Sequence, residues 1–284
     1  MTGSPPARPV PRTGASPALH VEVAGAERTV LAPVVLVHGV LDSARTFSRI
    51  RRILGERHLT VAYDRRGYQR SREAGAGTGD LADHVVDLLE VATSVAGATG
   101  SAPVTVLGHS FGAVVAIAAA GCRPDLLARV VAYEPPLPWL APDEPAGTEP
   151  AGTRTVTPAA RETPEAFAER LARSLLGDSR YERLSAGVRA GLALDGPAAR
   201  AEVSELARGP AFDASLVSAE VVVARGGDTA PRFVRAASYL VEHLPHARLC
   251  VLPGAGHGAH VTHPRELAAV VDPDVAAGVG LPPP

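Results

Sequence analysis

Residues 103–121 read PVTVLGHSFGAVVAIAAAG, and this stretch decides the fold. A short Val-rich run, Pro103–Leu107, predicts a buried strand, and the alanine-rich run Phe111–Ala120 predicts a helix that ends at Gly121. The pentapeptide GHSFG between them matches G-x-S-x-G, for which composition alone gives about 0.14 chance matches in this chain. A turn between a strand and a helix is the context that presents a nucleophilic serine. The alternative interpretation is a serine that only caps the helix.

Short apolar runs and helical patterns alternate along most of the chain. Val-rich runs of this length fit buried strands, whereas apolar residues at three- and four-residue spacing fit helices. The alternation predicts an α/β fold with a mostly parallel central sheet flanked by helices. The other strand candidates are Ala18–Val23, Val34–Val37, Leu59–Tyr63, Val130–Tyr133, Val221–Ala224 and Arg248–Leu252. The other helix candidates are Ala44–Leu54, Leu81–Val95 and Pro231–Leu244.

The alternation stops between Tyr133 and Glu220. A Pro-rich segment fills the first part of this interval. A first helical pattern then begins at Thr163-Pro164, and two more cover about 181–194 and 198–207. We therefore expect a helical cap inserted into the sheet-forming core. The expected divisions are a disordered tail at 1–18, a core at 19–134 and 220–276, a cap at 135–219 and a flexible tail at 277–284.

Composition excludes several classes of protein. The chain has 284 residues, 28 basic and 30 acidic side chains, and a formal net charge of −2. Such a balance predicts neither a nucleic-acid partner nor a membrane-surface partner. Two cysteines argue against a disulfide scaffold, and no stretch approaches the roughly 18 apolar residues of a membrane span. We expect a cytoplasmic protein that acts on a small molecule; its oligomeric state is not predicted.

A serine hydroxyl needs a base to act as a nucleophile at neutral pH. His257 is the candidate, because it follows the last strand candidate in the glycine-rich stretch Gly254-Ala255-Gly256-His257-Gly258. A structural histidine bonded to the backbone is the alternative. His263 is interpreted as the boundary of the final helix and His260 as a polar group in a loop.

The carboxylate that would orient the histidine has two candidates. Glu134 directly follows the strand candidate Val130–Tyr133 and precedes two prolines, and a carboxylate at a buried strand end has little structural purpose. Asp228 follows the strand candidate Val221–Ala224, but Asp228 and Thr229 also suit a helix cap before Pro231. Glu134 is slightly favoured, and both remain open.

Backbone amides near the serine provide a candidate oxyanion hole. His38-Gly39-Val40 follows the strand candidate Val34–Val37, so the Val40 N–H can join the Phe111 N–H. His38 itself is interpreted as structural. The spacing of the histidines and cysteines does not predict a metal site. No glycine-rich phosphate loop follows a strand candidate, so no cofactor is predicted either.

Taken together, these motifs resemble the α/β-hydrolase family. The matching stretches are Val34–Gly39, Tyr63–Tyr68, Gly108–Gly112 and Pro253–His257. The resemblance spans about residues 19–272, without the cap, and implies the eight-stranded type of α/β-hydrolase sheet. It also implies a Ser110–His257 pair, an oxyanion hole from Val40 and Phe111, a lid over the pocket, and a loop braced by Asp64 and Arg66.

The expected function is hydrolysis of a small or medium, largely apolar carboxylic ester, without a cofactor, through an acyl-enzyme on Ser110. The family places the orienting acid after either of two strands, so Glu134 and Asp228 both fit it. The same residues serve thioesterases, C–C bond hydrolases, perhydrolases and some lyases. A non-catalytic ligand-binding protein with the same fold is the alternative of a different class.

Overall fold

The computed structural model describes residues 19–25, 31–74, 78–100, 103–140 and 157–276. Within these ranges the chain forms a seven-stranded sheet of order β1-β3-β2-β4-β5-β6-β7. β1 pairs with β3 antiparallel, and every other pair of neighbours is parallel. The strands are β1 (Val21–Ala24), β2 (Val34–Val37), β3 (Thr60–Tyr63), β4 (Thr105–His109), β5 (Arg129–Tyr133), β6 (Glu220–Gly226) and β7 (Ala247–Leu252). The predicted mostly parallel sheet is confirmed.

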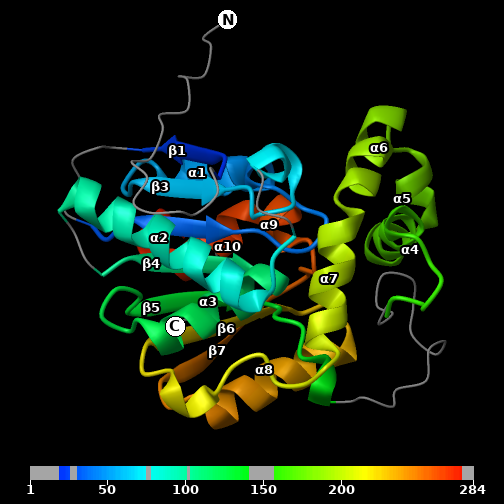
Figure 1. Cartoon of the computed structure of the whole chain (residues 1–284). Helices are drawn as coiled ribbons and strands as arrows, with labels where there is room; N and C mark the ends of the chain where they lie inside the picture. Colours follow the sequence, from blue (N-terminus) through cyan, green and yellow to red (C-terminus); the bar gives the residue numbers. More distant parts are fainter. Residues whose placement is uncertain (1–18, 26–30, 75–77, 101–102, 141–156, 277–284) are drawn as a thin grey trace, which may run out of the picture.

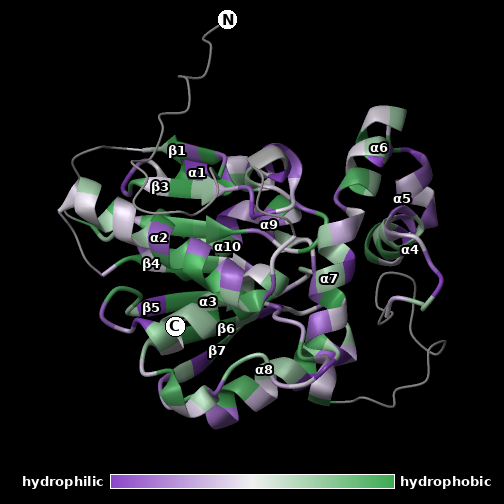
Figure 2. Ribbon diagram, in the orientation of Figure 1, coloured by the Kyte–Doolittle hydropathy of each residue, from purple (hydrophilic) through white to green (hydrophobic). Residues whose placement is uncertain are grey.

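Helices cover both faces of this sheet (Figure 1). Side chains of α2 (Leu81–Thr99), α3 (Phe111–Cys122) and α8 (Pro231–His243) pack into the larger hydrophobic cluster. Those of α1 (Ser48–Leu54) and α10 (Pro264–Val271) pack into the second cluster on the opposite face. The central strands are hydrophobic along their length because both faces are buried (Figure 2).

The described residues between β5 and β6 form four α-helices: α4 (Pro164–Leu176), α5 (Asp178–Glu182), α6 (Ala186–Leu194) and α7 (Gly196–Leu206). They stand beyond the carboxyl ends of the parallel strands, with α7 nearest the core (Figure 1). Phe167, Leu171 and Ala199 form their own small buried cluster. This cluster arises because α4 and α7 turn their apolar faces toward each other.

Two expectations about the elements need correction. The sheet has seven strands in the described ranges rather than eight, because the seven apolar runs of the sequence supply one strand each and β1 forms the edge of the sheet. The helical pattern at 181–194 forms two helices, since Ser185 starts α6 by accepting a hydrogen bond from the Val188 N–H. The tails expected at 1–18 and 277–284 lie outside the described residues.

None of the helices in the described ranges combines the length and apolarity that crossing a bilayer takes. This observation agrees with the composition, in which no long apolar stretch occurs.

Candidate active site

The turn between β4 and α3 is tightly constrained. Ser110 has φ 54° and ψ −123°, a conformation that costs energy for any residue with a side chain. A Cβ on Gly108 would lie 2.4 Å from the Gly112 carbonyl oxygen, and one on Gly112 would lie 2.2 Å from the carbonyl oxygen of Val37. Both glycines are therefore required for α3 to start directly against the sheet. The turn presents Ser110 at the carboxyl edge, as the sequence predicted.

His257 lies in the loop after β7 and contacts Glu134. Its Nδ1 is 2.7 Å from Glu134 Oε2. Because an ionised carboxylate only accepts hydrogen bonds, Nδ1 must carry the proton, which leaves Nε2 as the unprotonated basic nitrogen. The Phe233 ring stacks on the imidazole at 4.5 Å with an interplanar angle of 9°. The histidine is thus fixed in both tautomer and orientation.

Glu134 follows β5 with φ 48°, which turns its side chain toward the His257 loop. The residue is only 1% exposed, and its Oε1 accepts a hydrogen bond from the Gly226 N–H at 2.8 Å. Burial alone would raise the pKa of Glu134, but the interaction with His257 and the hydrogen bond from the Gly226 N–H outweigh it and hold the pKa below its usual value. The carboxylate is therefore ionised beside the imidazole at neutral pH.

The second candidate acid does not reach the histidine. Asp228 is exposed, and its backbone N–H donates to the Ala255 carbonyl at 2.9 Å. Its carboxylate makes no hydrogen bond or ion pair with any residue in the described ranges. The expected cap is also wrong, because α8 begins after Ala230 without a side-chain cap. Pro231 in the first turn has no N–H, which removes one of the donors that a cap would satisfy.

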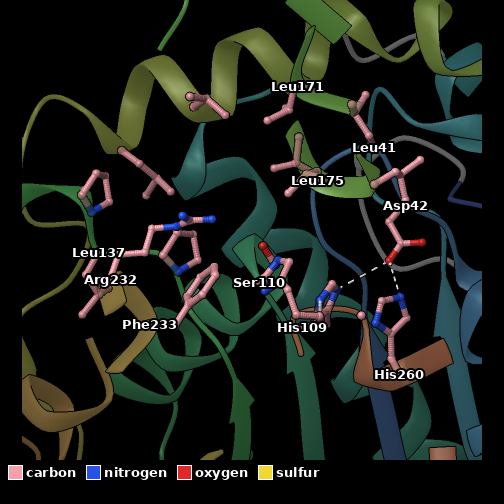
Figure 3. Close-up of a pocket in the computed structure, with 18 of the residues that line it drawn as sticks. Leu41, Asp42, His109, Ser110, Leu137, Leu171, Leu175, Arg232, Phe233 and His260 are labelled. Atoms are coloured by element: carbon pink, nitrogen blue, oxygen red, sulfur yellow. Dashed lines mark hydrogen bonds and ion pairs between the residues drawn. The ribbon is translucent and has the colours of Figure 1, made fainter. Parts of the chain in front are cut away.

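Ser110 and His257 line the same cavity. Figure 3 shows Ser110 between Phe233 and His109, with Leu171 and Leu175 on the opposite wall. No hydrogen bond joins the Ser110 hydroxyl to the His257 ring. Rotation about the Ser110 side chain is the movement that would form this bond.

The candidate oxyanion hole borders the serine directly. A Cβ on Gly39 would lie 2.9 Å from Ser110 Cβ, so the loop after β2 runs against the nucleophile turn. Val40 lines the cavity, and Phe111 is the first residue of α3. Neither backbone N–H donates to an acceptor in the described part of the chain. Both amides are therefore free to bind a developing negative charge.

A buried arginine that the sequence analysis did not identify holds this loop. Arg65 is fully buried; its Nε donates to the His38 carbonyl at 2.8 Å and its Nη2 to the Gly39 carbonyl at 3.0 Å. The Arg65 N–H also donates to His38 Nε2 at 2.8 Å. His38 is thus structural, and burial together with Arg65 lowers its pKa to about 3. These bonds link β3 to the candidate oxyanion loop.

The charge of Arg65 is balanced from the inserted helices. Glu202 on α7 is fully buried; its Oε1 is 2.5 Å from Arg65 Nη1 and its Oε2 is 3.1 Å from Nη2. The Tyr68 hydroxyl donates to Glu202 at 2.8 Å, and His84 Nε2 lies 3.0 Å away. A sequence signal existed, because Glu202 shares the apolar face of α7 with Ala198, Ala199 and Leu206. A carboxylate on such a face requires a buried partner.

Asp64 and Arg66 brace neighbouring loops, in line with their expected role. Asp64 accepts a hydrogen bond from the Ala44 N–H at 2.9 Å. Arg66 forms a bidentate pair with Asp87 of α2, with both contacts at 2.7 Å. These interactions fix the segment after β3, from which Arg65 projects.

The cavity has a volume of about 460 Å³ and a mostly apolar wall. Such a volume suits a small or medium organic ligand. Trp139 is not part of this wall and packs near Phe212 with ring centroids 6.2 Å apart. Phe167 is buried between the inserted helices, whereas Leu171 reaches the cavity. The apolar side chains in the wall include Leu41, Leu137, Leu140, Leu171, Leu175, Leu206 and Phe233.

One further cluster of polar side chains lines this cavity. It consists of Asp42, His109 and His260, each of which has one possible ligand atom within 4.8 Å of those of the other two. In the described ranges, this is the group of side chains whose donors suit a metal ion. His260 was interpreted as a loop residue, but it lies in the short helix α9 (Ala259–Thr262) and is 6% exposed. The interpretation was wrong because Asp42, far away in sequence, attracts the imidazole inward.

Solved structures of hydrolases share the fold. An enol-lactonase from Burkholderia xenovorans LB400 is 19% identical, with a TM-score of 0.65 over 90% of this chain and 95% of the other. A thermophilic esterase from Thermogutta terrifontis is 21% identical, with a TM-score of 0.64 over 93% and 96%. The 2-hydroxy-6-oxo-6-phenylhexa-2,4-dienoate hydrolase of Rhodococcus sp. strain RHA1 is 20% identical, with a TM-score of 0.62 over 92% and 94%. At these identities the likeness shows the fold alone.

The sequence itself also matches a family. The model of the alpha/beta hydrolase family covers residues 34–270, which run from the start of β2 almost to the end of α10. The match includes the serine turn, both candidate acids and the histidine loop, and it agrees with the resemblance that the motifs predicted. The chain therefore belongs to the alpha/beta hydrolase family of enzymes.

Proposed function

We propose that this protein is a serine hydrolase that cleaves a small or medium, largely apolar carboxylic ester. The observation that carries the proposal is the 2.7 Å contact between His257 Nδ1 and Glu134, because it leaves His257 Nε2 basic in the cavity that Ser110 lines. A strained serine, an oriented imidazole and a buried carboxylate are the groups that acyl transfer needs. The apolar wall of the cavity supports an apolar substrate.

In the proposed mechanism, Ser110 Oγ attacks the ester carbonyl carbon while His257 Nε2 takes the hydroxyl proton. The carbonyl oxygen becomes negative and is stabilised by the N–H groups of Val40 and Phe111. Glu134 holds the imidazolium by its charge and by the Nδ1–H bond. The proton on Nε2 then passes to the departing alkoxide, which leaves as the alcohol. A water molecule activated by His257 releases the acid and restores Ser110.

The inserted helices α4–α7 act in this proposal as a lid that selects the substrate. Leu171 and Leu175 of α4 and Leu206 of α7 line the cavity opposite the serine. The ion pair from Glu202 to Arg65 supports a fixed position for α7. Substrate choice therefore depends on the side chains of α4 and α7 more than on the strands.

A second candidate substrate class follows from the arginines in the cavity wall. Arg180, Arg232 and Arg235 line the cavity, and Arg232 lies over the Phe233 ring at 4.6 Å. Arginine recognises carboxylates well. An ester or lactone whose acyl or alcohol part carries a carboxylate is therefore the second candidate, and the structural similarity to an enol-lactonase is compatible with the lactone form of such a substrate.

A fluorophosphonate probe tests the proposed nucleophile. The wild type should be labelled once per chain, and Ser110→Ala should not be labelled. Asp228→Asn is the matched control, because Asp228 is exposed and its carboxylate does not contact the His257 loop. Absence of labelling in a folded wild type, judged by circular dichroism, would favour the non-catalytic binding protein over the hydrolase.

A substrate series then separates the remaining alternatives. The panel contains p-nitrophenyl esters of increasing acyl length, the corresponding thioesters, and half-esters of dicarboxylic acids of equal length. The primary proposal expects neutral esters to have the highest kcat/KM. If half-esters exceed neutral esters and Arg232→Gln removes the advantage, the second candidate is favoured. Preference for thioesters would reassign the leaving group without changing the nucleophile.

A further inference from the structure

The cluster of Asp42, His109 and His260 adjoins the proposed catalytic groups without belonging to them. Asp42 Oδ2 lies 3.6 Å from His109 Nδ1 and 3.2 Å from His260 Nε2 (Figure 3). The His109 and His260 rings are 4.0 Å apart between centroids, and the two residues are 5% and 6% exposed. Three ligand atoms from the β2 loop, the serine turn and α9 thus converge in the cavity wall.

The protonation state of His109 follows from its second nitrogen. His109 Nε2 is 2.9 Å from the backbone carbonyl of His257. A carbonyl only accepts, so Nε2 must carry the proton. Nδ1 is consequently the nitrogen that is left to act as a ligand, and it faces the Asp42 carboxylate at 3.6 Å.

This arrangement buries two possible ligand atoms beside each other. His109 Nδ1 and Asp42 Oδ2 are both buried, and neither has a hydrogen-bond partner of good geometry in the described ranges. Burying such groups unsatisfied is costly. A cation that accepts lone pairs from both atoms would satisfy them together, and His260 Nε2 is close enough to supply a third ligand.

The spacing suits a small divalent transition metal. Ligands at 2.0–2.1 Å from a tetrahedral zinc ion lie about 3.3 Å apart. The separations of 3.2 Å and 3.6 Å from Asp42 Oδ2 bracket this value, and the two imidazole nitrogens lie within 4.8 Å of each other, so a small movement of one ring would complete the site. Two imidazoles and one carboxylate are donors that zinc and its neighbours accept. All three residues also belong to the lining of the cavity.

Supporting hydrogen bonds are already present on two of the three ligands. Metal-binding histidines usually donate their other N–H to a carbonyl or carboxylate, as His109 does to His257. The second oxygen of Asp42 accepts a hydrogen bond from the Ser43 N–H at 2.8 Å. His260 has no such partner for Nδ1 in the described ranges, so its ring is the adjustable ligand.

We propose that Asp42, His109 and His260 form a binding site for one zinc-class divalent cation in the wall of the cavity. The ligand atoms are Asp42 Oδ2, His109 Nδ1 and His260 Nε2. This site is separate from the Ser110, His257 and Glu134 group, and its existence does not depend on the proposed hydrolase activity. A bound cation would tie the loop after β2 to the serine turn and to α9.

The test measures metal binding by the full-length, tag-free chain after removal of metal with a chelator. Equilibrium dialysis against Zn²⁺ should give one ion per chain, and Co²⁺ should give the visible absorption bands of a tetrahedral site with nitrogen and oxygen ligands. Asp42→Asn and His260→Gln should each weaken the affinity at least about 10-fold. At the same zinc concentration, zinc should raise the melting temperature of the wild type by more than that of either variant.

Three controls locate the bound ion. His243→Gln removes an exposed imidazole that stacks on Tyr239, and it should bind zinc as the wild type does. Cys122→Ser removes the exposed thiol and should also have no effect. Ser110→Ala should bind zinc normally, which separates this site from the proposed nucleophile.

The proposal is overturned if the wild type binds no stoichiometric zinc. It is also overturned if Asp42→Asn and His260→Gln, each folded by circular dichroism, bind zinc as tightly as the wild type. Loss of binding in Cys122→Ser, or thiolate charge-transfer bands with Co²⁺, would assign the ion to a cysteine and reject the cluster.

Discussion

Replacing Glu202 with glutamine tests whether the inserted helices hold the candidate oxyanion loop in place. The substitution keeps the side-chain volume and removes the charge that balances Arg65. Both side chains have 0% exposure, and the carboxylate has two contacts to Arg65 and one each to Tyr68 and His84. Removing one partner of a buried ion pair costs about 3–5 kcal/mol, because the remaining charge stays buried without compensation.

The effect on activity follows from the other bonds of Arg65. The same guanidinium binds the carbonyls of His38 and Gly39, so a displaced Arg65 shifts the loop that carries the Val40 amide. A small misplacement of a catalytic group reduces turnover by up to about 100-fold. We therefore expect kcat for the best ester to fall about 10-fold to 100-fold, with a smaller change in KM.

The matched control is Glu182→Gln in α5. Glu182 Oε1 also lies 2.5 Å from an arginine, Arg173 Nη2, but its side chain is 58% exposed. Exposed ion pairs contribute about 0–1 kcal/mol. Urea unfolding followed by circular dichroism measures the free energy of both variants. Equal losses for Glu202→Gln and Glu182→Gln, or an unchanged kcat in Glu202→Gln, would refute the reasoning.

The pH dependence gives an independent check of the same pair. Burial would raise the pKa of Glu202, but the charge of Arg65 and the contact with His84 lower it to about 2. Because the pKa of Glu202 is lower in the folded chain, its ionised carboxylate stabilises the fold at pH values above the ordinary pKa near 4.3. This contribution is lost as the pH falls toward 2. The stability gap between wild type and Glu202→Gln should therefore narrow over that range. A gap that stays constant there would contradict the assignment.

Three further predictions address the serine turn, the acid and a buried histidine. Glu134→Gln should lower kcat by about 10²–10⁴, because the single oxygen of an amide cannot replace the two carboxylate oxygens that contact His257 and Gly226. Asp228→Asn should change kcat little. Steady-state kinetics that give the reverse ranking would reassign the acid. Gly112→Ala should lower the free energy of unfolding by about 3 kcal/mol, because the new Cβ clashes with the backbone. Gly97→Ala, where a Cβ has nothing within 4 Å, should raise it by about 0.5–1 kcal/mol. Urea unfolding measures both changes, and similar values for the two variants would reject the steric argument. His38 has its pKa lowered to about 3, so below pH 6.5 the unfolded chain binds a proton that the folded chain does not, and stability should fall by about 1.4 kcal/mol per pH unit; a slope unchanged in His38→Gln would contradict this.

The nucleophile turn was predictable because its evidence is local. A strand, a glycine-flanked serine and a helix occur within twenty or so residues, and each leaves a periodic or compositional signal. The mostly parallel sheet likewise followed from the alternation of apolar runs with helical patterns. The break at Ser185 had a local signal too, since serine before an apolar run is a typical helix start.

The choice between Glu134 and Asp228 was not local. Both follow strands, and only the left-handed conformation of Glu134 and the approach of the His257 loop separate them. Neither feature has a signature in the sequence around the acid. The Asp42 cluster was missed for the same reason, because its three members lie on segments far apart in the chain and meet only after the sheet forms.

The position of Glu134 ahead of the inserted helices has an engineering consequence. Every proposed reacting group except His257 precedes residue 135, so the segment from 141 to 219 can be exchanged for that of a relative without touching the chemistry. The graft has one electrostatic condition: the donor segment must bring a carboxylate to the place of Glu202, or Arg65 must be neutralised at the same time. Chimeras that ignore this condition should express as insoluble chains rather than as enzymes with altered selectivity.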